Sequence, residues 1–148
     1  MAKLTKEIEN LFKEQTGLTK KQKFCVYLAT ATRDGNPNVV PIGGSRLRGE
    51  ETIVIPVNFL NKTKNNIEEN PRVAIVVSDE EKHDGYQFKG KIKIEYSGTI
   101  FEETEKFMRD FSKAAGIDPP ILPKGAAVFT IEEVYSVKPG KEAGKRLI

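Results

Sequence analysis

The chain has 148 residues, of which 38% are hydrophobic and 30% are charged, a composition that is ordinary for one globular domain spanning residues 1–148. Its 24 basic and 21 acidic residues are largely interspersed, so the net charge of +3 does not indicate the clustered basic face of a nucleic-acid-binding protein. A single cysteine, Cys25, excludes an intrachain disulfide, and the absence of an apolar run near the roughly 20 residues of a membrane helix leads us to expect a cytoplasmic protein with no membrane partner.

Two kinds of pattern alternate along the chain. Ile8, Leu11 and Phe12 have helical spacing and predict a helix over residues 5–16, with Gly17 as its stop. Runs rich in β-branched and aromatic residues, separated by turn signals, predict strands. In chain order these runs are 23–32, 38–44, 52–57, 72–78, 85–101 and 126–137. A short helix is expected within residues 58–73, and Phe107, Met108, Phe111 and Ala115 predict a second amphipathic helix.

The predicted strands mostly follow one another without helical crossovers, which favours antiparallel pairing. Gly90 and Gly98 interrupt the longest strand and are expected to mark bulges or bends. The sequence therefore predicts a mainly β fold of six or seven antiparallel strands, closed into a small barrel and flanked by helices.

The short helix in "NFLNKTKNNIEENPRV" has its charges reversed. The helix dipole favours acids in the first turn and bases in the last, yet Lys62 and Lys64 begin this helix and two glutamates end it. A phosphate bound at the helix start would make both lysines favourable, and Asn61 or Thr63 could cap the helix. A solvated helix is the alternative, since each misplaced lysine costs only about 0.3–1 kcal/mol. The charge pattern alone leaves both interpretations open.

Two neighbouring segments suit the approach of a flat ligand. In "PIGGSRLR", residues 41–48, Gly43 and Gly44 would let backbone come close to a ring, and Arg46 can donate to phosphate. A plain bend between strands would also explain the glycine pair. The apolar strand "TIVIPV" ends directly before the helix that carries the lysines, so a ring could rest on the strand end while its phosphate reaches the helix.

Three segments resemble the core of the FMN-binding split-barrel proteins, the relatives of pyridoxamine 5′-phosphate oxidase. They are "DGNPNVVPIG", "IVIPVNFLNKTKNNIEENPRVAI" and "GYQFKGKIKI", and the "NKT…IEENPRV" block is the most specific of them. The resemblance implies a six-stranded antiparallel split β-barrel with flanking helices. It also implies a homodimer with FMN sites shared between the two protomers.

The resemblance also assigns residues to the cofactor, FMN. It places Ile42, Gly43, Gly44, Ser45 and Arg46 around the flavin and its ribityl phosphate, Pro56, Val57 and Asn58 along the ring, Lys62 and Thr63 at the phosphate, and Gln87 at the cofactor from the long strand. The group that compensates the two lysines is then the FMN phosphate. Neither a catalytic residue nor a metal site is assigned.

One departure from the vitamin-B6 oxidases affects the expected activity. Those enzymes end in a substrate-binding segment with a histidine between arginines, whereas this chain ends in "KPGKEAGKRLI" and has one histidine, His83, in a polar loop. We therefore expect an FMN-dependent oxidoreductase acting on a different small molecule. The alternatives are an FMN electron carrier between proteins and, from the pI of about 8.9, a nucleic-acid-binding barrel. The relatives include deazaflavin-dependent and haem-handling proteins, so these ligands also stay open.

Overall fold

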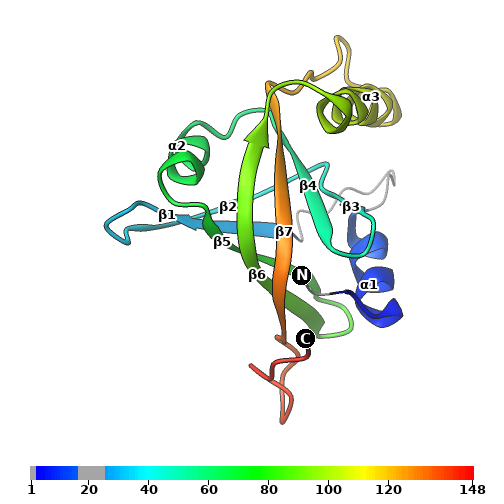
Figure 1. Ribbon diagram of the computed structural model, residues 1–148. Coiled ribbons are helices and arrows are strands. Elements are labelled where there is room, and N and C mark those ends of the chain that lie inside the picture. The colour runs from blue at the N-terminus through cyan, green and yellow to red at the C-terminus, as the bar shows by residue number, and fades with distance from the viewer. Residues whose placement is uncertain (1–2, 17–25) are drawn as a thin grey trace.

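A computed structural model describes residues 3–16 and 26–148, which form three helices and seven strands (Figure 1). In chain order these elements are α1 (Lys6–Thr16), β1 (Val26–Ala31), β2 (Pro37–Pro41), β3 (Arg46–Arg48), β4 (Thr52–Val57), α2 (Asn61–Glu69), β5 (Arg72–Asp79), β6 (Asp84–Glu95), α3 (Thr99–Ala114) and β7 (Gly125–Ser136). The predicted helix stop at Gly17, the start of the first predicted strand and Cys25 lie outside the described residues.

All seven strands belong to one antiparallel sheet in the order β2-β1-β5-β6-β7-β4-β3. The expected mainly β fold with flanking helices is confirmed, with seven strands where the resemblance implied six. The additional strand is β3, which pairs with β4 from Arg46 opposite Val54 to Arg48 opposite Thr52. Three residues are too few to show a period-2 pattern, so the sequence could not indicate this strand.

The two longest strands, β6 and β7, pair along most of their length and run side by side through the middle of Figure 1. Their register shifts between Lys89 and Gly90, which confirms the bulge expected at Gly90. A Cβ atom at Gly90 would collide with the backbone carbonyl oxygen of Thr130, so only glycine fits there. The predicted strand 85–101 was too long, because β6 ends at Glu95 and α3 begins at Thr99. Gly98 is the residue directly before α3.

The core lies inside the curved sheet and is closed by α1. Phe12, on α1, is fully buried and meets Phe88 of β6 edge to face, with 6.1 Å between the ring centroids. The Thr5 side chain accepts a hydrogen bond from the backbone N–H of Ile8 and so caps α1, a contact that the sequence analysis did not identify. No helix within the described residues is long and apolar enough to span a membrane.

Candidate functional site

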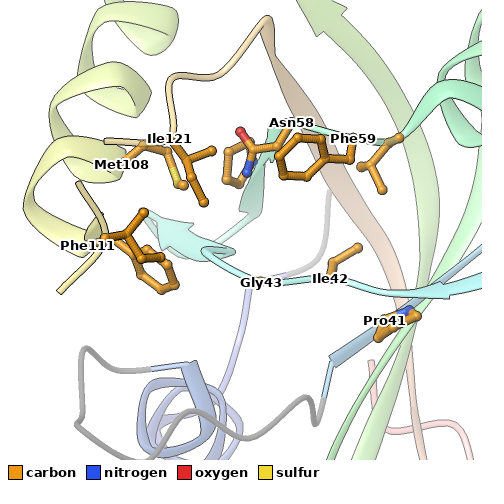
Figure 2. A pocket seen from close by; sticks show the side chains of 11 residues that line it. Pro41, Ile42, Gly43, Asn58, Phe59, Met108, Phe111 and Ile121 are labelled. Carbon is orange, nitrogen blue, oxygen red and sulfur yellow. The ribbon is translucent and has the colours of Figure 1, made fainter. Parts of the chain in front are cut away.

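An apolar pocket of about 320 Å³ lies at the edge of the core, between the link from β2 to β3, the end of β4 with the segment after it, and α3 with the loop that follows it. Its described lining residues come from these three places: Pro41, Ile42 and Gly43; Pro56, Asn58, Phe59 and Leu60; Met108, Phe111, Ile117 and Ile121. Figure 2 shows α3 closing one side, with the Ile42–Gly43 backbone facing Asn58 and Phe59 across the opening.

The described residues that line the pocket include no ionisable side chain, and Asn58 is the one amide among them. The Asn58 Oδ1 atom is buried and has no hydrogen-bond partner among the described residues. Phe59 stands at the rim with 77% of its surface exposed. Ligand pockets typically combine apolar walls with a few polar groups that fix orientation, so this pocket suits an uncharged ring.

The loop after α3, which carries the lining residues Ile117 and Ile121, is hydrogen-bonded to α3. The backbone N–H of Ile121 donates to the Ser112 hydroxyl at 3.0 Å, and that of Ile117 donates to the Ser112 carbonyl at 2.8 Å. Ser112 itself is fully buried. These bonds fix the apolar side chains of Ile117 and Ile121 as part of the pocket wall.

The pocket ends at the start of α2. Leu60 lines the pocket and is also the residue before the helix, where its carbonyl accepts the N–H of Lys64 at 2.8 Å. No side chain caps the helix and no acid occupies its first turn, while Lys62 is exposed there. The first backbone N–H groups of a helix lack partners within the helix, so this end can hold an anion.

The expectation that Asn61 or Thr63 caps α2 was wrong. Asn61 is already the first helical residue, and Leu60 before it has no side chain able to accept a hydrogen bond. The Thr63 side chain is buried, and its hydroxyl accepts a hydrogen bond from Asn38 Nδ2 at 3.3 Å. The Thr63 side chain therefore faces β2. As the third helical residue, Thr63 can offer the helix start only its backbone N–H.

Two arginines join β3 to α3. Arg48 binds Glu103 through two hydrogen bonds of 2.9 and 3.3 Å, which lowers the pKa of the Glu103 carboxyl. Arg46 donates to the Thr104 hydroxyl at 2.9 Å and lies 5.4 Å from the centre of the Phe107 ring. Burial lowers the pKa of the Arg46 guanidinium, an effect that Glu103 opposes. The Arg46 Nη1 atom is buried without a partner among the described residues.

The structure brings only part of the predicted site together. Of the predicted residues, Ile42, Gly43, Pro56 and Asn58 line the pocket, and Lys62 and Thr63 belong to the adjoining first turn of α2.

The other predicted residues lie elsewhere. Gly44 lies behind the pocket wall, where a Cβ atom would come within 3.0 Å of Pro56 and 3.1 Å of Met108. Ser45 is buried, Val57 belongs to the barrel core, and Gln87 lies on β6 between Val76 and Tyr135.

Sequence reasoning missed the wall that α3 and the following loop contribute. Met108 and Phe111 were recognised only as the apolar face of a helix, and the proline-rich segment 116–125 only as a connection. The apolar residues Ile117 and Ile121 within that connection were the available signal. A loop that keeps such side chains needs a surface to cover.

Comparison with known proteins decides the family. The model of the pyridoxamine 5′-phosphate oxidase family matches residues 5–138. The chain belongs to this family. The uncharacterized protein MJ0282 of Methanocaldococcus jannaschii is similar to this chain, with 38% identity over 125 residues, which cover 81% of this chain and 77% of that protein.

Solved structures share the fold of this family member. HupZ from Group A Streptococcus is 26% identical, with a TM-score of 0.76 over 95% of this chain and 99% of that chain. An FMN-binding protein from Syntrophomonas wolfei is 20% identical, with a TM-score of 0.68 over 88% of each chain. The split-barrel fold expected from the resemblance is therefore confirmed, and β2 and β3 are the two edge strands of its sheet.

Proposed function

We propose that this member of the pyridoxamine 5′-phosphate oxidase family binds FMN and acts as an oxidoreductase on a small molecule other than a vitamin-B6 phosphate. One observation supports the proposal above all: an uncharged apolar pocket ends at the uncapped amino end of a helix that carries Lys62. The tricyclic ring of FMN suits the pocket, and its phosphate suits the helix end.

The residues present fit FMN in distinct roles. Ile42, Gly43 and Pro56 would pack against the ring, and the Asn58 amide would orient it by hydrogen bonding. Lys62 would pair with the phosphate. Bound FMN supplies hydride and single-electron transfer, and the apolar walls exclude water from its reactive edge. The FMN-binding protein of Syntrophomonas wolfei, which has the same fold, supports this choice of ligand.

A different substrate is proposed because the one histidine of the chain, His83, is not placed to bind a substrate in the pocket. It is exposed in the turn before β6 and is absent from the described lining of the pocket. Turnover of NADH or NADPH by the FMN-loaded protein would support an enzyme. Reduction only by partner proteins would instead support an electron carrier.

The proposal is tested by comparing FMN with riboflavin, which lacks the phosphate. Lys62→Ala should weaken FMN binding by about 10- to 100-fold, the value of one hydrogen bond to a charged group, and leave riboflavin binding unchanged. Lys64→Ala is the matched control, because Lys64 Nζ lies 5.6 Å from the centre of the Tyr96 ring and is directed toward it. Quenching of flavin fluorescence measures both affinities. If the wild type bound FMN and riboflavin equally, the phosphate assignment would be wrong.

We also propose a homodimer in which the partner subunit covers the FMN site. Phe59 and Ile117, which line the pocket, and Leu122, which follows the lining residue Ile121, are large, apolar and 37–77% exposed, as expected of a surface that a second protein buries. Light scattering of the FMN-loaded protein should give a dimer mass. A monomer mass at micromolar concentration would contradict this arrangement.

A further inference from the structure

A group of polar side chains is buried between α2 and the first two strands. Thr30 of β1 and Asn66 of α2 are each 4% exposed, and the Asn66 Nδ2 atom donates to the Thr30 hydroxyl oxygen at 3.0 Å. Asn38 of β2, which lies opposite Thr30 in the sheet register, donates from Nδ2 to the same oxygen at 3.5 Å. Asn38 Nδ2 also donates to the Thr63 hydroxyl at 3.3 Å.

These contacts hold α2 at its first turn. Thr63 is the third residue of the helix, and Asn66 lies three positions later on the same helix face. Thr30 on β1 thus contacts Asn66, and Asn38 on β2 contacts Thr63, near the start of α2. Burying a polar side chain costs desolvation free energy, which its hydrogen bonds must offset. An apolar side chain would dock the helix without that cost. The polar contacts add something an apolar contact lacks: hydrogen-bond geometry that fixes the rotation and height of the helix end.

We propose that Thr30, Asn38 and Asn66 are positioning residues for an anionic group at the amino end of α2, an inference that rests on the phosphate site proposed above. The three side chains do not touch the ligand. They fix the backbone N–H groups of the first turn so that these groups converge on one point. A ligand site needs its supporting residues to hold it within about 0.5 Å, and the network supplies that support.

The test compares variants that remove the network with one that loosens α2 elsewhere. Thr30→Val keeps the size and β-preference of the side chain while removing the shared acceptor, and Asn66→Leu removes a donor while favouring helix. Asn70→Ala is the matched control, since Asn70 ends the same helix and its Nδ2 donates to the Thr32 carbonyl at 3.4 Å. Affinities for FMN and for riboflavin are measured by fluorescence, together with thermal melts.

We expect Thr30→Val and Asn66→Leu to lower the ratio of FMN to riboflavin affinity by about 3- to 10-fold, as one or two weakened hydrogen bonds would. Riboflavin affinity should stay within about two-fold, and Thr30→Ser, which keeps the hydroxyl, should restore the ratio. Asn70→Ala should lower the melting temperature without changing the ratio. An unchanged ratio in folded Thr30→Val, or an equal loss of ratio in Asn70→Ala, would overturn the inference. A wild type with no preference for FMN would instead refute the phosphate site itself.

If Thr30→Val failed to fold, the Asn66→Leu comparison would decide in its place. Asn66 lies on a surface helix rather than in the sheet, so its replacement leaves the strand pairing intact.

Discussion

Gly43 and Gly44 are adjacent, yet the structure gives them opposite roles that substitution can separate. Gly44 has a φ angle of +73°, in the region that L side chains rarely adopt. A Cβ atom there would lie 3.0 Å from the Pro56 side chain and 3.1 Å from the Met108 sulfur, both closer than ordinary contacts. The backbone conformation costs about 1–2 kcal/mol and the overpacking about 1–3 kcal/mol. Gly44→Val should therefore destabilise the protein by roughly 2–5 kcal/mol.

Gly43 has neither constraint. Its φ angle lies outside the left-handed region, and an added Cβ atom would meet no atom within 4 Å. Gly43 lines the pocket, so a valine there would enter space that the proposed ring needs. Gly43→Val should leave the melting temperature of the flavin-free protein nearly unchanged and weaken FMN binding by about 5- to 150-fold, since overpacking costs about 1–3 kcal/mol.

Thermal melts of both flavin-free variants, followed by FMN titration, test this separation. A fall of about 6–12 °C is expected for Gly44→Val from a loss near 3 kcal/mol in a chain of this size. A normal melt for Gly44→Val would mean that α3 does not pack on this backbone as described. Normal FMN affinity in Gly43→Val would place the ring elsewhere.

Two further predictions concern stability. Phe12→Ala should lower the free energy of unfolding by about 3–5 kcal/mol, because the ring is fully buried against Phe88. Phe59→Ala is the control and should change the melting temperature little, because Phe59 is 77% exposed. Similar losses of stability in the two variants would contradict the assignment of the core. Glu103→Gln should lower the melting temperature at pH 7, because Arg48 depresses the pKa of the Glu103 carboxyl and the pair therefore adds stability above the ordinary pKa of 4.5. That stability is lost as pH falls through the depressed pKa, so the wild type and the variant should converge in acid, and a constant difference at every pH would contradict the ion pair.

Local pattern was sufficient for most of the elements. The strand predicted at 52–57 matches β4, because it is a short continuous apolar run bounded by polar residues. The helix predicted at 5–16 matches α1 to one residue, because its apolar residues have helical spacing. The bulge at Gly90 was also readable, since a glycine inside a long strand has few other reasons to be there. The reversed charges of α2 pointed to the helix end at which the structure places the pocket.

The sequence by itself determined the antiparallel mainly β fold and the two segments that meet at the pocket, because period, turn residues and short-range charge are properties of neighbouring residues. Tertiary structure alone decided what closes the pocket and which residues support it. Ile121 reaches the pocket because Ser112 holds its loop, and Thr63 faces inward because Asn38 lies beside it. Such contacts depend on how strands and helices from distant parts of the chain pack, and no spacing within one segment encodes that packing.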